Sequence, residues 1–488
     1  MNILYVLYGD FSTNTSNPII SFTEELKKLG HDCVIAIPDD SIHRIPETSS
    51  SFRACSFSEI LKSPFNIYQN NEPASIIHAC TPRQVVFGFV EKYMSILPTP
   101  LAIYLEDNEF WITDHYLNSI GKSLKELSFN ELSTLVPLSL SHPNDYKTFL
   151  GYADVIILIQ EKLEIEVPPS IPCEVIPWGI DLTFFRPLEK DHLLRKTLGI
   201  SDTSKIIVYP GGLNGFTLPA IKDLCMATLL INNAGIDCVL IRTGPNPLFF
   251  IDELGPDARK YIIDVGVIDR SQLPNIMGLA DIFVQPGRID PFEDLRLPSK
   301  LPEFLGMGKP ILIPNVNIAN KFIDGKDLKI LNFGTPDEIA NECISIFSNP
   351  KIAIEYGHRA RKFAVNNFDI VKQSEKLEEC YKGAIKNFNL KATEAAWKAC
   401  TNKNLLEGVL TKFSYKPFFQ NSNNIKVLNY FGSIITSLQD QCALLGTPPP
   451  IAKPKVILNS SSIYKSLLLT LSTSNSKLKS LFKKLPHL

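Results

Sequence analysis

The chain of 488 residues has no long apolar run. No stretch approaches the roughly 20 consecutive apolar residues that a membrane-spanning helix needs. The first residues, MNILYVLYGD, also lack the basic segment and the small-residue cleavage site of a signal peptide, and their pattern is that of a buried strand. We therefore expect a cytoplasmic protein without a membrane-spanning helix.

Paired cysteines are missing as well. The ten cysteines are scattered and none belongs to a C-x-x-C pair. A zinc site or a disulfide framework is therefore not expected, and the pattern favours buried free thiols in a reducing compartment.

Arginine is absent from the last fifth of the chain. Residues 391–488 contain 13 lysines and only Glu394, Glu407 and Asp440 as acids, so this region carries a charge of +10 and the first 390 residues carry about −12. The C-terminal region is chemically distinct, and it is expected to form a separate extension.

Short apolar runs alternate with helical patterns over most of the chain. The runs NILYVLY, DCVIAIP, SIIHAC, PLAIYLE, DVIILI and CEVIPWG form a first series, and KIIVYPGG, DCVLIRTG, YIIDVGVI, DIFVQPG and KPILIP form a second. Such runs indicate parallel sheets covered by helices on both faces. The sequence predicts an α/β protein with two Rossmann-like domains that join near residue 187, and residues 353–387 indicate helix.

The stretch DLRLPSKLPEFLGMGKPILIP (294–314) places charged residues where a helix should begin. Ser299 is a plausible N-cap, and Lys300 and Arg296 beside free helix amides would make an anion site. Glu303, one turn further on, could accept hydrogen bonds from sugar hydroxyls. A nucleoside diphosphate fits this pattern; alternatively, Glu303 caps its own helix and Lys300 is solvated.

Three longer stretches carry a family resemblance. EVIPWGIDLTFFRP, GVIDRSQLPNIMGLADIFVQPG and RLPSKLPEFLGMGKPILIP resemble the C-terminal half of GT-B retaining glycosyltransferases of family 4. SIIHACTPRQVV and AIYLEDNEFW resemble N-terminal halves in a bacterial subgroup with EDNE and RLPSKLPEF motifs. The resemblance spans roughly residues 1–388.

The resemblance implies a domain map. Residues 1–187 would form an acceptor-binding domain, 188–365 a nucleotide-sugar-binding domain, 366–388 a helix that crosses back to the first domain, and 389–488 the basic extension. A nucleoside-diphosphate sugar would be the donor substrate, and no cofactor or metal is expected, since no acidic D-x-D pair suited to a metal-bound donor is present.

The resemblance also assigns roles to donor-side residues. Glu303 matches the second glutamate of the family's E-x7-E motif, which binds the ribose, and Lys300 and Arg296 would lie near the diphosphate. The turn at Gly266 and Val267 would receive the base. The remaining implied donor-side residues are Gly211 and Gly212, whose turn must approach the phosphates closely, together with Ser299 and Arg242.

Two departures from the family pattern concern the donor. The first glutamate of the motif falls on Leu295, and no basic residue follows the glycine turn before Lys222, so charge neutralisation would fall to Arg296, Lys300 and Arg242. Either the site is rearranged, or the chain is a catalytically silent GT-B-like binding subunit. An epimerase is a more distant alternative, and a dehydrogenase is disfavoured because no G-x-G-x-x-G follows the first strand.

Polar residues at strand ends are the acceptor-side candidates. Asp10 follows the first strand, and Ser12 to Ser16 form a polar loop before the next helix, a natural contact for an acceptor or a phosphate. Arg83 either lines the cleft or caps its helix. His78 could contact substrate, although a histidine in an apolar strand is more often a hydrogen-bonded core residue.

Three acids crowd the stretch YLEDNEFW. Asp107 and Glu109 are the candidates for gripping acceptor hydroxyls, whereas Glu106 is expected to be a solvated loop charge. Trp111 either stacks on a sugar or packs in the core. His78, Asp107 and Glu109 are thus the catalytic candidates, and no catalytic base is assigned.

The family pattern implies transfer with retention, in which fixed cations and helix dipoles stabilise the departing phosphate. The acceptor is an unidentified hydroxyl of a glycan, a lipid or a small molecule. The end of the chain, SIYKSLLLTLSTSNSKLKSLFKKLPHL, is either a basic amphipathic element on the inner face of a membrane or a helix whose lysines keep it soluble. Nucleic acid is not expected as a partner.

Overall fold

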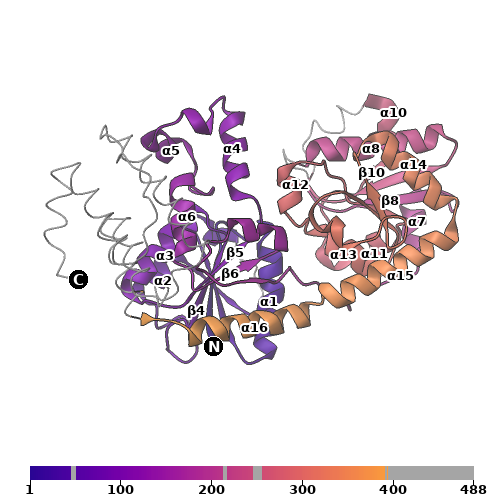
Figure 1. The fold of residues 1–488 in the computed structure, drawn as a ribbon. Coiled ribbons are helices and arrows are strands. Elements are labelled where there is room, and N and C mark those ends of the chain that lie inside the picture. The colour runs from indigo at the N-terminus through magenta and orange to yellow at the C-terminus, as the bar shows by residue number, and fades with distance from the viewer. Residues whose placement is uncertain (45–50, 213–216, 246–254, 391–392, 394–488) are drawn as a thin grey trace, which may run out of the picture.

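The structure is a computed structural model, and it describes residues 1–44, 51–212, 217–245, 255–390 and 393. Two lobes stand side by side, each built on one parallel sheet (Figure 1). The predicted basic extension, including its membrane-binding alternative, falls almost entirely outside the described residues. No helix in the described part of the chain is long and apolar enough to cross a membrane.

The N-terminal lobe contains a seven-stranded parallel sheet in the order β3-β2-β1-β4-β5-β6-β7. Its central strands are buried along their whole length, as the continuous apolar runs predict. The strands are β1 (Asn2–Val6), β2 (Asp32–Ile37), β3 (Arg53–Ser56), β4 (Ile76–Cys80), β5 (Leu101–Leu105), β6 (Val155–Leu158) and β7 (Cys173–Val175). The helices are α1 (Ser16–Lys28), α2 (Phe57–Lys62), α3 (Gln84–Ile96), α4 (Glu109–Ser119), α5 (Phe129–Leu135) and α6 (Pro143–Gly151).

The C-terminal lobe contains two three-stranded groups, β10-β9-β8 and β11-β12-β13, all parallel. A bridge between Ile207 and Ile282 joins them into one sheet. The strands are β8 (Lys205–Tyr209), β9 (Cys238–Arg242), β10 (Ile262–Asp264), β11 (Phe283–Val284), β12 (Ile311–Pro314) and β13 (Lys329–Leu331). The helices are α7 (His192–Thr197), α8 (Leu218–Asn233), α10 (Gly255–Arg259), α11 (Leu273–Gly278), α12 (Pro291–Leu295), α13 (Lys300–Met307), α14 (Pro336–Phe347) and α15 (Pro350–Asn367).

Both sheets reverse their strand order at one point, between β1 and β4 and between β8 and β11. Open parallel sheets bind ligands outside the carboxyl ends of their strands at such points. The predicted α/β class with two Rossmann-like domains is confirmed by this topology.

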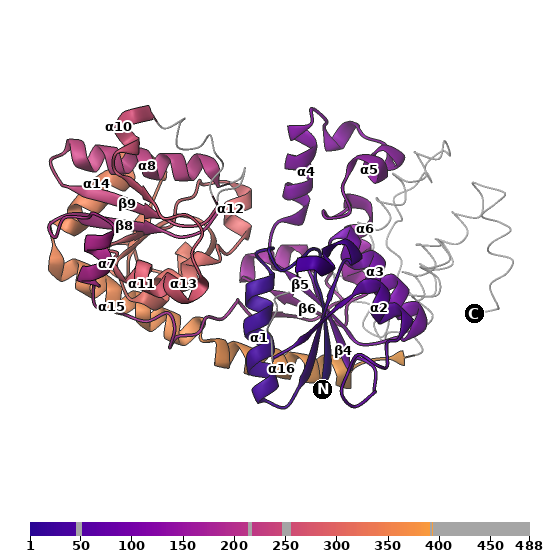
Figure 2. The same ribbon diagram turned by 180° about the vertical axis from the view of Figure 1, so that it is seen from behind.

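The last described helix, α16 (Ile370–Lys386), returns to the N-terminal lobe and packs beside α1 (Figure 2). The helix predicted at 353–387 is therefore two helices. The break lies at Phe368 and Asp369, where the Asp369 carboxylate accepts a hydrogen bond from the Val371 amide and caps α16.

Candidate functional site

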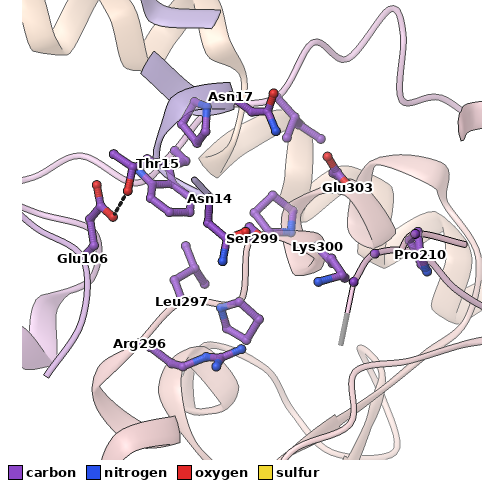
Figure 3. A pocket seen from close by; sticks show the side chains of 18 of the residues that line it. Asn14, Thr15, Asn17, Glu106, Pro210, Arg296, Leu297, Ser299, Lys300 and Glu303 are labelled. Atoms are coloured by element: carbon purple, nitrogen blue, oxygen red, sulfur yellow. Dashed lines mark hydrogen bonds between the residues drawn. The ribbon is translucent and has the colours of Figure 1, made fainter. Parts of the chain in front are cut away.

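A cleft of about 1010 Å³ lies between the two lobes and is lined by residues of both. Figure 3 shows Glu106 and Thr15 on one side of the cleft, and Lys300 and Glu303 on the other. The predicted residues that line it are Arg83, Asp107, Gly211, Gly212, Val267, Arg296, Ser299, Lys300 and Glu303.

Glycines follow the three adjacent strands β8, β9 and β10 at this edge. Gly211, Gly244 and Gly266 all have positive φ, at 110°, 96° and 74°. A Cβ atom on Gly244 would lie 2.5 Å from the carbonyl carbon of Gly211, so the two turns pack backbone to backbone. This part of the cleft wall is therefore main chain, which a ligand can approach closely. Gly266 itself is not among the residues that line the cleft, although its neighbour Val267 is.

Lys300 reaches across this glycine edge. A Cβ atom on Gly211 would lie 2.9 Å from Lys300 Nζ, and the ammonium lies 5.3 Å from the centre of the Tyr209 ring. The glycine is thus what leaves space for the lysine. The ammonium and the first amides of α13 together make this end of the cleft positive.

Ser299 differs from its predicted role in one respect. It lies at the N-cap position of α13, but its backbone is already helical (φ −57°, ψ −26°) and its side chain makes no capping hydrogen bond. Instead, the Leu301 amide donates to the Pro298 carbonyl, which tightens the start of the helix. The Ser299 side chain lines the cleft.

Glu303 is the fourth residue of α13, and its carboxylate forms an ion pair with Arg270, another residue that lines the cleft. The distance from Arg270 Nη2 to Glu303 Oε1 is 3.4 Å. Burial raises the pKa of the Glu303 carboxyl, and the positive charges of Arg270 and Lys300 act against that increase. A carboxylate is therefore held beside two cations at the mouth of one helix.

Arg296 and Glu293 occupy the region where the family motif has its first glutamate. Leu295 itself packs against the core, and Glu293 is buried with its Oε2 3.5 Å from Arg296 Nε. Burial raises the pKa of Glu293 to about 7, and Arg296 acts against that increase. A carboxyl is thus present two residues before the expected position, but it is not among the residues that line the cleft.

Arg242 does not face the cleft. Its side chain is fully buried, and it donates to the Gly211 carbonyl at 3.4 Å and to Asp264 Oδ2 at 3.2 Å. The prediction that it would neutralise a diphosphate is therefore not supported by its position. Arg242 thus stabilises the glycine turn by donating a hydrogen bond to the Gly211 carbonyl.

On the N-terminal side, Glu106 is the acid that sequence reasoning placed wrongly. It is buried at the end of β5, lines the cleft, and accepts a hydrogen bond from Thr15 Oγ1 at 2.6 Å. Its Oε1 has no hydrogen-bond partner among the described residues. Burial raises the pKa of Glu106 to about 8, so this carboxyl is not the solvated loop charge that was expected.

Asp107 also lines the cleft, facing positive charge from both lobes. Burial raises the pKa of the Asp107 carboxyl, and Arg296 and then Arg83 act against that increase. Asp107 is thus the predicted acceptor-side acid that the fold brings to the cleft.

Glu109, in contrast, is not among the residues that line the cleft. It is buried, and it contacts Arg83 Nε at 3.3 Å and accepts from Ser141 Oγ at 2.8 Å. The Arg83 guanidinium lies 3.8 Å from the centre of the Tyr8 ring. The Glu109 carboxylate is therefore directed at Arg83 and Ser141, and its role as a catalytic candidate stays a prediction.

His78 is a core residue. Its Nδ1 lies 2.6 Å from the Tyr381 hydroxyl of α16, which in turn donates to the Tyr5 hydroxyl at 3.2 Å. Complete burial lowers the pKa of His78 to about 3, which keeps the ring neutral. The structure thus places His78 as the hydrogen-bonded core residue of the alternative, and its catalytic role stays a prediction.

Asp10 and Ser12 do not line the cleft either. The buried Asp10 carboxylate accepts from the side chain and the amide of Ser12, the latter at 2.8 Å. The two residues stabilise the loop that carries Asn14 and Thr15, both of which do line the cleft. Their contribution is to shape this loop.

Sequence reasoning missed Arg270. Arg270 begins a 3₁₀ turn six residues after β10 ends at Asp264, so its place in the loop at the carboxyl edge of a strand could have marked it. Thr15, in contrast, belongs to the polar loop from Ser12 to Ser16, which was expected to contact an acceptor or a phosphate, and it lines the cleft. The hydrogen bond between Thr15 and Glu106 carries no such local signal, because the two residues are 91 apart in the sequence.

Comparison with known proteins identifies solved structures of similar fold. A sucrose-phosphate synthase from Thermosynechococcus elongatus matches with a TM-score of 0.60 and 14% identity, covering 80% of this chain and 100% of that one. HepE from Anabaena, in complex with UDP and glucose, matches with a TM-score of 0.57 and 15% identity, covering 78% of this chain and 99% of that one. A glycosyltransferase from Rickettsia africae matches with a TM-score of 0.56 and 16% identity, covering 79% of this chain and 99% of that one.

The chain has the GT-B fold. At these identities the likeness establishes the fold alone. No model of a protein family matches the sequence, and neither does any curated protein.

Proposed function

We propose that this protein is a retaining glycosyltransferase that moves a sugar from a nucleoside-diphosphate sugar to a hydroxyl acceptor. The observation that carries the proposal is the position of Lys300. Its ammonium lies over the Gly211 turn, at the mouth of α13, inside the cleft between the two Rossmann-like lobes. A GT-B chain without a donor site would not need this arrangement.

The diphosphate is proposed to bind against the glycine edge. Lys300, Arg296 and Arg270 line the cleft and supply positive charge, and the amides at the start of α13 add hydrogen-bond donors. Glu303, which lies one turn along the same helix, is then within the same cleft to accept hydrogen bonds from a ribose diol.

A uridine nucleotide is the first donor to test. One solved structure of similar fold is that of HepE in complex with UDP-glucose, which matches with a TM-score of 0.57 and 15% identity. UDP-glucose is a ligand of that protein, and it serves here only to order the candidate nucleotides.

The chemistry follows from charge. When the sugar departs, negative charge grows on the diphosphate, and cations already fixed in place stabilise it without reorganisation. The acceptor hydroxyl is proposed to attack from the face that the diphosphate leaves, and the departing phosphate oxygen takes the hydroxyl proton. Asp107 and Glu106, on the opposite side of the cleft, are proposed to orient the acceptor by hydrogen bonds to its hydroxyl groups.

The test is nucleotide release from a panel of UDP-, GDP- and ADP-sugars, together with calorimetric binding of each free nucleoside diphosphate. The variants are Lys300→Met and Glu303→Gln. A lost charge-assisted hydrogen bond is worth about 1.5–3 kcal/mol, so each variant is expected to weaken binding by roughly tenfold to a hundredfold. Lys196→Met, which removes an exposed lysine of α7 in the same lobe, is the matched control.

The outcomes separate the two functions that the sequence left open. Nucleotide release that depends on Lys300 supports the transferase. Tight binding without release from any donor supports the silent binding subunit. Binding that is equal in the wild type, Lys300→Met and Lys196→Met would contradict both, since the cleft would then not be the nucleotide site.

A further inference from the structure

One buried glutamine of the N-terminal lobe contacts the backbone of the donor-side segment. Gln160 follows β6 and is only 3% exposed. Its Nε2 donates to the carbonyl oxygens of Asp294 at 2.9 Å and Arg296 at 3.2 Å. Both of its amide protons are therefore committed to two carbonyls of the other lobe, on either side of Leu295.

The Asp294 side chain connects the two lobes at the same place. Its Oδ1 lies 2.5 Å from Lys162 Nζ of the N-terminal lobe and accepts from the Asn317 amide of the C-terminal lobe at 3.1 Å. Asn317 is buried and has φ at +46°, an uncommon conformation for a residue other than glycine. The segment 294–296 is thus held from both lobes at once.

A stack of rings adds a third connection. Trp111 of α4 lies 4.5 Å from Phe292 of α12, centre to centre, and the guanidinium of Arg296 lies 5.2 Å from the same Phe292 ring. The side chain of Arg296 therefore packs on a ring that the N-terminal lobe positions. Its backbone carbonyl is positioned by Gln160.

We infer that Gln160 is a positioning residue that couples the placement of Arg296 to the relative position of the lobes. The inference rests on the proposed function, because Arg296 matters only if it faces the donor diphosphate. Donor turnover then requires the lobes to be in this arrangement, since a cation must be fixed before negative charge develops in order to lower the barrier.

The first test is hydrogen exchange of the full-length chain without any ligand. In Gln160→Met, which keeps the size of the side chain but removes its donors, amides in the peptide 292–301 are expected to exchange at least fivefold faster. Glu161→Gln is the matched control, because Glu161 also joins the lobes, through an exposed ion pair with Lys321, but its carboxylate makes no hydrogen bond or ion pair with the described segment 294–296. Unchanged exchange in Gln160→Met would overturn the inference, whatever the protein does with nucleotides.

The second test is a double-mutant cycle on nucleotide release from the donor that the wild type uses best. Gln160→Met is expected to lower kcat by roughly tenfold with KM within about twofold, since losing buried hydrogen bonds costs on the order of 1–3 kcal/mol. In an Arg296→Met background the same substitution should change kcat by less than twofold, because its effect passes through Arg296. Additive losses would show that Gln160 acts only on general stability and would overturn the inference.

Gln160→Glu provides a pH-dependent comparison. An ionised carboxylate would face two carbonyl oxygens and repel the segment, whereas a protonated one can donate a single hydrogen bond. Taking each exchange rate relative to the wild type at the same pH, we expect 292–301 to exchange faster than in Gln160→Met at pH 8 and this excess to disappear as the pH falls toward 5. The opposite order would contradict the hydrogen-bonding role. A wild type that binds and turns over no nucleotide would refute the proposed function, and the exchange results would still decide the contact role of Gln160.

Discussion

The two lobes share a strand order but have different carboxyl edges. Six strands of the N-terminal sheet, β3-β2-β1-β4-β5-β6, follow the same order of addition as β10-β9-β8-β11-β12-β13. The edge of the second sheet is made of glycine turns beneath Lys300, whereas that of the first carries the acids Glu106 and Asp107. The topology determines where each edge lies, and the few residues after each strand determine what it can bind.

The carboxyl edges of the two sheets also differ in charge. On the N-terminal side, buried acids are compensated by Arg83, by hydrogen bonds, or by a raised pKa. On the C-terminal side, cations gather around backbone that leaves room for an anion. The four predictions below test this contrast, starting with the largest expected effect.

Arg83→Met should destabilise the N-terminal lobe strongly. Glu109 has a fully buried side chain and would lose the cation that compensates its carboxylate, which typically costs about 3–5 kcal/mol. Chemical denaturation measures the loss. The double variant Arg83→Met/Glu109→Gln should recover part of it, and a stability equal to the wild type in the single variant would show that the pair is not what compensates this edge.

Gly211→Ala should weaken nucleoside-diphosphate binding by at least tenfold. The added Cβ would meet the Lys300 side chain, and the positive φ adds strain of about 1–3 kcal/mol. Gly235→Ala is the control, because Gly235 also has a positive φ, at 88°, but an added Cβ would meet nothing within 4 Å. Calorimetric titration of both variants separates backbone strain from displacement of Lys300; equal binding losses would contradict the role of the lysine.

Glu106→Gln should change how stability depends on pH. Because burial raises the pKa of Glu106 from 4.5 to about 8, the folded protein holds a proton that the unfolded chain has released between these values. The free energy of unfolding should therefore fall as pH rises from about 4.5 to about 8, and less steeply in the variant. Denaturation at several pH values measures the slopes. Glu126→Gln, at an exposed position, should keep the slope of the wild type.

Trp111→Leu should have the smallest effect. It removes the stack on Phe292 between the lobes, which is worth about 0.5–1.5 kcal/mol beyond buried area. Thermal unfolding measures the change, and Phe110→Leu, at a half-exposed neighbour, should be close to neutral. A loss several times larger would mean that this stack, more than the polar contacts of Gln160, holds the lobes together.

The central strands were predictable because their signal is local. A strand buried on both faces must be continuously apolar, and the eleven predicted runs correspond to β1, β2 and β4–β12. The prediction missed β3 and β13, which lie at the edges of their sheets. The sequence of β3, RACS, is short and partly polar, as an edge strand can be, and such a segment does not stand out from a loop.

The site was predictable only where local pattern determined it. Lys300 and Glu303 were identified because a helix start after a strand end is visible in the sequence. The three acids in EDNE look alike in sequence, but Glu109 is paired by Arg83, 26 residues away, and Glu106 by Thr15, 91 residues away. Which acid faces the cleft is therefore a consequence of tertiary packing.

The return of α16 to the N-terminal lobe has a consequence for synthesis of the chain. Tyr381 is completely buried there, against Tyr5 and His78, yet it is translated after the entire second sheet. The first lobe therefore emerges from the ribosome with part of its interior uncovered, and its folding is completed only when the last described helix has been made. Translation order thus makes the lobe that begins folding first the one that finishes last.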